Sequence, residues 1–121
     1  MNEVFVVSAL TVPATAAPNG SITVSDTTKN SGVERVVGQS TTQYYLSTKT
    51  ILDGVTEVPL GSRIVPGLAA GASSVGADVS VTIPSNATLG TNYIIAETDY
   101  GDVKSEANEK NNTRYKAITI Q

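Results

Sequence analysis

The feature that most constrains this chain is a series of short, β-branched runs in which apolar and polar residues alternate. The clearest run spans residues 73–83, where Val75, Ala77, Val79, Val81 and Ile83 fall at every second position. A period of two predicts a strand with one buried face, because successive side chains of a strand point to opposite sides. No window has the periodicity and caps of an amphipathic helix, so we expect an all-β fold.

The spacing of these runs predicts how the strands are arranged. We expect seven strands, separated by turn residues, at residues 4–12, 21–29, 41–47, 57–65, 73–83, 91–99 and 112–120, with turns at 14–20 and a loop at 33–40. Parallel strands would need long crossover connections, and the sequence offers none. The fold class we predict is therefore an immunoglobulin-like antiparallel β-sandwich of about seven strands. Pro59 and Gly61 place the strand at 57–65 on a sheet edge.

One predicted inner face carries a charge. In the strand at 21–29, Asp26 shares a face with Ile22, Val24 and Thr28. An unpaired buried carboxylate would cost several kcal/mol. Either the strand slips its register there, or Asp26 finds a partner such as Lys29 or a backbone donor. Other pairs expected to share a face are Tyr44 with Leu46 (Tyr45 lying opposite), Ile94 with Ala96, and Ile118 with Ile120.

Composition removes several classes of function. The 121 residues leave room for one domain and include neither Cys nor His, which excludes disulfides, thiolate zinc sites, Cys nucleophiles and His general bases. Ser and Thr are abundant but none has a visible base, so we do not expect an enzyme. A net charge of −3 with scattered cations gives no nucleic-acid footprint, and no apolar run is long enough to insert into a membrane.

The segment from Glu97 to Glu109 concentrates negative charge. It holds five of the eleven acidic residues. Carboxylate and amide oxygens are the hard ligands that Ca²⁺ takes, although the spacing here is not that of an EF-hand. If the loop folds back on itself, the candidate metal ligands are Asp99, Asp102, Glu106 and Asn108.

A structural role for the same loop is the expectation we favour. The amides of Asn108, Asn111 and Asn112 can bond backbone groups that regular pairing leaves without partners. Glu106 and Glu109 can accept from backbone N–H groups or pair with nearby cations. We therefore expect these five residues to organise the loop. Asn30 either does similar work after its own strand or simply follows the turn preference of Asn.

Tyr93 follows a Gly turn just inside the strand predicted at 91–99. This is the tyrosine-corner position of immunoglobulin-like folds, in which the ring packs in the core and the hydroxyl bonds upstream backbone. We expect Tyr93 to have that structural role.

Seven segments of the sequence form a pattern that extends over nearly the whole chain: 21–32, 44–47, 52–53, 60–62, 68–71, 90–93 and 106–112. Together they resemble the CARDB family, the cell adhesion related domain found in bacteria. The resemblance implies one β-sandwich domain over residues 1–121, cut from a longer exported protein and located outside the cell or on its surface. Such a module would act in adhesion or as a spacer. Its partners would be neighbouring domains of the same chain, another surface protein or carbohydrate. No cofactor is implied, with calcium at the acidic loop as the alternative.

Overall fold

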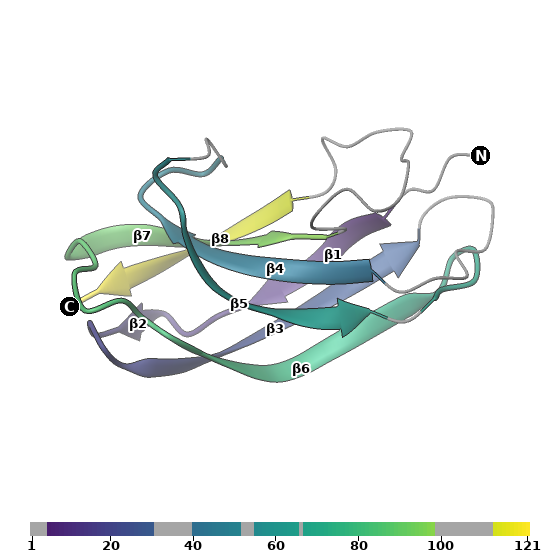
Figure 1. Ribbon diagram of the computed structural model, residues 1–121, viewed down its shortest axis with the longest axis horizontal. Coiled ribbons are helices and arrows are strands. Elements are labelled where there is room, and N and C mark those ends of the chain that lie inside the picture. The colour runs from purple at the N-terminus through teal and green to yellow at the C-terminus, as the bar shows by residue number, and fades with distance from the viewer. Residues whose placement is uncertain (1–4, 31–39, 52–54, 66, 99–112) are drawn as a thin grey trace.

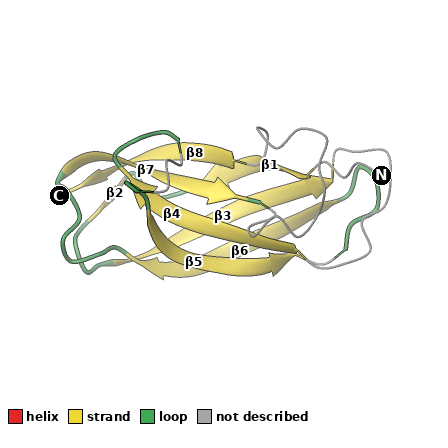
Figure 2. Cartoon of the chain, turned by 45° about the horizontal axis from the view of Figure 1, so that its top comes forward, coloured by secondary structure: helices red, strands yellow, loops and turns green. Residues whose placement is uncertain are grey.

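The computed structural model describes residues 5–30, 40–51, 55–65, 67–98 and 113–121, which form two sheets packed face to face (Figures 1 and 2). Within these residues there are eight strands: β1 (Phe5–Thr11), β2 (Thr15–Ala16), β3 (Ser21–Asn30), β4 (Ser40–Ser47), β5 (Val58–Val65), β6 (Ser73–Thr82), β7 (Gly90–Glu97) and β8 (Thr113–Ile120). The all-β sandwich is confirmed. The described part contains no helix that could cross a membrane.

The strands divide unequally between the sheets. One sheet has the order β1-β3-β6 and the other has the order β2-β8-β7-β4-β5. All pairs are antiparallel except β2 with β8, which are parallel. β5 lies at a sheet edge, as Pro59 and Gly61 predicted. The residues of the loop expected at 33–40 lie outside the described part as far as residue 39, and Ser40 already belongs to β4.

The segment expected to be entirely turn contains an additional strand. Thr15 and Ala16 form β2 and pair with Thr119 and Ile120 of β8. The turn itself is confirmed further on, where Asn19 has a φ of 65°. Asn tolerates this left-handed conformation better than most other residues do. The strand was missed because two residues are too few to show a period.

Alternate residues of both sheets fill the space between them. The pairs predicted to share a face are confirmed, since Tyr44, Leu46, Ile94, Ala96, Ile118 and Ile120 all belong to one buried cluster. The same cluster contains Val7, Leu10, Ile22, Val24, Val81 and Ile83. The described core is therefore aliphatic, with the ring of Tyr44 as its large member.

The alternation in β6 does not continue along its whole length. Val24 of β3 pairs with Val79, but Asp26 pairs with Gly76, so β6 has one residue more than β3 over this interval. This is a β-bulge, and a shift of one residue exchanges the two faces of a strand. Val75 is therefore 68% exposed, which corrects the prediction that it shares a face with Val81, and Gly76 is buried.

The corner before β7 is made by Asn92 rather than by Tyr93. Asn92 is 2% exposed, and its Nδ2 donates to the carbonyl of Thr88 at 2.8 Å and to that of Gly90 at 3.2 Å. Tyr93 is half-buried outside the core cluster, and its ring meets Tyr115 edge-on at a centroid distance of 5.6 Å. The prediction that the Tyr93 ring packs in the core is wrong, because residues 92, 94 and 96 take the inward positions.

Asn30 organises the chain beyond β3. Its Nδ2 donates to the carbonyl of Leu68 at 3.0 Å, and its backbone bonds Gly71 and Ala72. The side chain is completely buried. Of the two explanations left open for Asn30, the structure supports the organising role.

The first strand, β1, begins at one end of the sandwich, and the last strand, β8, finishes at the other. Phe5 opens β1 beside Asn30, the last residue of β3. Ile120 closes β8 beside Ala16 and Gly90, near the start of β3. Figure 1 shows the start of β1 and the end of β8 toward opposite ends of the long axis.

Candidate functional site

The inner face of β3 carries a buried charge that is paired across the sandwich. Asp26 is 2% exposed, and Arg63 reaches it from the edge strand β5 of the opposite sheet. Arg63 Nε lies 2.7 Å from Asp26 Oδ1, and its Nη2 lies 3.1 Å from Oδ2. The two-point geometry is the one in which Arg binds carboxylates best. An ion pair thus ties one sheet to the other.

Hydroxyl groups complete this cluster, which we call the interlayer tie: Asp26, Thr28, Thr42, Tyr44, Arg63 and Ser74. Asp26 accepts from Thr28 Oγ1 at 2.9 Å and from the Tyr44 hydroxyl. Arg63 also donates to the Oγ and the carbonyl of Ser74, at 3.1 and 2.9 Å. Thr28 and Thr42 share a hydrogen bond at 3.0 Å. The bonds run within the cluster, and it is therefore structural.

The pairing of β3 with β6 does shift between Val24 and Asp26, but Asp26 remains on the buried face of β3. Of the two explanations considered, a partner is therefore the one that satisfies the carboxylate. The partner is Arg63, so the suggestion of Lys29 is wrong. Lys29 belongs to the opposite face of β3, because neighbours along a strand alternate between its two faces.

Gly76 makes room for the guanidinium. A Cβ at residue 76 would lie 1.9 Å from Arg63 Nε and 2.2 Å from Cδ. Such distances are impossible for nonbonded atoms, so any other residue would displace Arg63. The bulge in β6 and the absence of a side chain at residue 76 together open the path by which Arg63 reaches Asp26.

The surroundings raise the pKa of two members of the tie, Tyr44 and Arg63. Burial, and then the hydrogen bond to Asp26, raise the pKa of the Tyr44 hydroxyl above its ordinary value. For Arg63, burial alone would lower the pKa, but the hydrogen bond and charge of Asp26 outweigh it and raise the pKa above its usual value. Tyr44 therefore stays neutral, and Arg63 stays charged, up to a higher pH than either group would in water.

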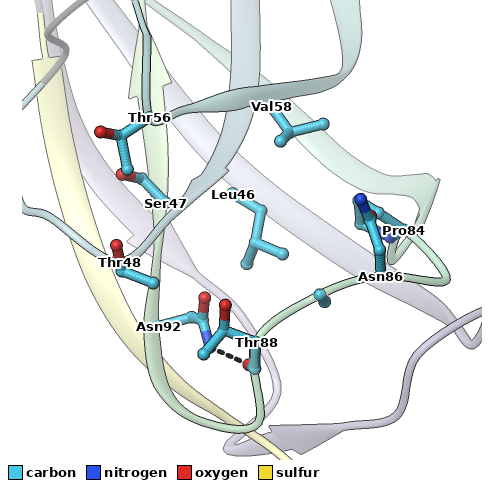
Figure 3. A pocket seen from close by; sticks show the side chains of 10 residues that line it. Leu46, Ser47, Thr48, Thr56, Val58, Pro84, Asn86, Thr88 and Asn92 are labelled. Atoms are coloured by element: carbon cyan, nitrogen blue, oxygen red, sulfur yellow. Dashed lines mark hydrogen bonds between the residues drawn. The ribbon is translucent and has the colours of Figure 1, made fainter.

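A small open cavity lies between the β4–β5 and β6–β7 connections (Figure 3). Its volume is about 110 Å³. Leu46, Val58, Pro84 and Ala87 give it an apolar part, and Ser47, Thr48, Thr56, Asn86, Thr88 and Asn92 give it neutral polar groups. The described lining contains no ionisable side chain. Such a cavity can hold water or accept a small neutral group, but its lining offers no acid, base or anionic ligand.

The residues predicted to hold a metal or to organise the acidic loop lie outside the described part of the chain, apart from Tyr93. These are Asp99, Asp102, Glu106, Asn108, Glu109, Asn111 and Asn112. Both predictions for this loop stay predictions. Within the described residues, no group of three acidic side chains is placed to hold a metal ion.

Sequence reasoning missed Arg63 and Gly76. The signal for Arg63 was indirect. Asp26 required a cationic partner with a long side chain, and Arg63 is such a residue in the strand predicted at a sheet edge. Gly76 did have a signal, because an isolated Gly inside an alternating strand run often marks a β-bulge or the close approach of another group.

The match to a known family covers almost the whole chain. The family model for CARDB matches residues 2–116. This chain belongs to the CARDB family. The match of the family model confirms the predicted resemblance, and the sandwich described above is the fold of a CARDB domain. A search of curated protein sequences finds no match.

Solved structures with the same fold come from several kinds of protein. The CARDB domain of a Pyrococcus furiosus protein, in complex with di-metal ions, is 17% identical, with a TM-score of 0.69, covering 99% of this chain and 90% of that one. A domain of a "putative cell surface protein" from Methanosarcina acetivorans is 22% identical, with a TM-score of 0.65, covering 100% and 94%. The β-D-glucoside glucohydrolase of Trichoderma reesei is 15% identical, with a TM-score of 0.60, covering 98% of this chain but 19% of the enzyme. The matched part of this enzyme has the same fold as the CARDB domain.

Gly76→Ala tests whether Arg63 can reach Asp26 only because residue 76 has no side chain. We expect it to lower the free energy of unfolding by about 3 kcal/mol, since displacing one partner of a buried ion pair typically costs 3–5 kcal/mol. Urea denaturation measures this loss. In an Arg63→Ala background the same substitution should cost little, because the clashing atoms are gone. Ser80→Ala, at an exposed position of the same strand, is the control. An equal cost of Gly76→Ala in both backgrounds would contradict the steric explanation.

The raised pKa of the Tyr44 hydroxyl predicts that the free energy of unfolding falls at alkaline pH. Because its native pKa is raised, the unfolded chain releases the proton first. Its contribution is complete below the unfolded pKa of about 10 and declines as pH rises from there toward the native pKa. Urea denaturation between about pH 9 and 11 should show this decline. The decline in the free energy of unfolding with pH should become shallower in Tyr44→Phe. It should not change in Tyr115→Phe, because residue Tyr115 is 52% exposed. Identical slopes in all three proteins would contradict the assignment.

Proposed function

We propose that this CARDB domain is a noncatalytic spacer module of an exported surface protein, holding its neighbouring domains apart. The observation that carries the proposal is the position of the two ends. β1 begins and β8 finishes at opposite extremes of the sandwich (Figure 1). Modules connected through such ends form a row, because each adds its long axis to the last. Domains whose ends lie side by side would fold back instead.

The interior and the surface agree with this role. The interlayer tie is mostly buried, with the side chain of Arg63 12% exposed and that of Asp26 fully buried, and its ion pair joins the two sheets. The open cavity is small and its described lining is neutral. The archaeal domain named for a cell surface protein supports an exported location. Neighbouring domains of the same chain are the partners we propose.

Two copies joined end to end test the spacer role. We expect small-angle X-ray scattering to give a maximum dimension close to twice that of one copy, since a ten-residue strand alone spans about 33 Å. The single domain is the control. A compact pair with little increase in length would contradict the proposal. Digestion of intact host cells by an external protease would test the location, and a protected domain would contradict it.

A second candidate is a calcium-dependent module that uses Asp99, Asp102, Glu106 and Asn108. The observation that favours it is the Pyrococcus furiosus relative in complex with di-metal ions. Oxygen donors of this kind suit Ca²⁺, which takes roughly 6–8 of them. A bound ion would stabilise the folded chain, because it binds the native state in preference to the unfolded one.

Thermal melting with added CaCl₂ separates this candidate from the simple spacer. We expect calcium at about 100 times its Kd to raise the free energy of unfolding by about 2.7 kcal/mol. Asp99→Asn with Asp102→Asn should remove the increase. Glu57→Gln, outside the acidic loop, should keep it. A melting temperature unchanged by millimolar calcium would contradict the metal site.

A further inference from the structure

The strands that carry the two ends of the chain belong to different sheets. β1 pairs with β3 in one sheet, and β8 pairs with β7 in the other. Both run from the Asn30 end of the sandwich toward the Gly90 end. A force that pulls the ends apart therefore draws β1 one way and β8 the other, along the strand axes. Under this load one sheet tends to slide over the other.

Each terminal strand resists this force in shear. β1 makes six residue pairs with β3, and β8 makes eight with β7. Antiparallel hydrogen bonds lie perpendicular to the strands, so a pull along the axis loads them together. A pull that opened the ladder from one end would instead break the bonds one at a time, at a lower force.

β2 connects the two loaded strands directly. It follows β1 in sequence but pairs with β8 in the other sheet. The N–H of Thr119 donates to the carbonyl of Ala14 at 2.9 Å, and the N–H of Gln121 donates to that of Ala16 at 2.9 Å. Because β2 and β8 are parallel, tension drives them in opposite directions along a common axis. Both hydrogen bonds must then fail together.

The interlayer tie opposes the same sliding movement. Asp26 lies on β3, beside the loaded β1, whereas Arg63 lies in the sheet that contains β8. Displacing one sheet along the other would separate the charges inside the core. An unpaired buried charge is costly, so this pair adds resistance in the direction of the load.

We propose that the domain bears mechanical tension between its ends, with the β2–β8 pairing as the clasp that joins the two sheets under load. This inference rests on the proposed spacer role, because only a module connected at both ends carries tension. The domain would then transmit force between its neighbours as well as keep them apart.

Single-molecule force spectroscopy in two directions tests the proposal on the full chain. The first pull is between the N- and C-termini. The second is between the N-terminus and a thiol introduced by Lys29→Cys, in a chain that has no other Cys. Lys29 pairs with Val6, so this pull peels β1 from β3 one pair at a time. We expect the end-to-end unfolding force to be at least about twice the peeling force, since forced unfolding is governed by the barrier crossed in the direction of pulling. Equal forces would overturn the proposal.

Thr119→Pro tests the clasp itself. It removes the N–H that donates to Ala14 and spares the bonds to β7, because a residue of an antiparallel strand directs its N–H and C=O to one neighbour. The end-to-end force should fall by about a third or more, while the peeling force stays the same. Thr119→Ala, which keeps the N–H, should match the original chain. An unchanged end-to-end force in folded Thr119→Pro would overturn the assignment of the clasp. If that variant does not fold, the comparison of directions decides.

The two proposals fail in different ways. An extended tandem that unfolds at equal forces in both directions would retain the spacer and reject the tension-bearing role. A compact tandem with a high end-to-end force would reject the spacer and retain the mechanical property.

Discussion

Asp26 brings a carboxylate into the space between the two sheets, and much of the sandwich is arranged to satisfy it. Left unpaired, this charge would cost several kcal/mol, a large part of the net stability of a domain of this size. Arg63 supplies the partner from the edge strand of the facing sheet, and Gly76 leaves the space through which it passes. The bulge in β6 places Gly76 at that level. Three residues and one bulge thus meet at one ion pair.

The pair specifies the structure more than it adds stability. Replacing a buried ion pair with apolar residues is often neutral or stabilising, whereas removing one partner is strongly destabilising. Here a slip of one residue between β3 and β6 would bring a side chain with a Cβ against the guanidinium, where the space admits only Gly76. The tie therefore penalises the wrong register of β6 and the wrong placement of β5. Apolar residues in the same positions would penalise neither.

The same arrangement connects the fold to the proposed role. A module that separates its neighbours must keep its two ends apart, and one that carries tension must also keep its sheets from sliding. Strand order achieves the first, since β1 begins where β3 finishes and β8 finishes near where β3 begins. β2 and the interlayer tie address the second, one through backbone hydrogen bonds and the other through buried charge. Neither needs a catalytic group or a cofactor.

The sequence by itself determined the fold class, the faces of the regular strands and the edge position of β5, because period-two patterning and Pro placement are local properties of the chain. It also determined that Asp26 needed compensation. Tertiary structure decided how: Arg63 is 37 residues away, and no local rule relates the two. Tertiary structure also showed that the face of β7 shared by Asn92, Ile94 and Ala96 is the buried one, which leaves Tyr93 outside the core. Likewise, β2 exists only because β8 lies beside it, and the bulge that turns Val75 outward becomes visible only when β6 is set against β3. Local patterns fix which residues can be buried, but bulges and cross-sheet contacts depend on where the partner strands lie.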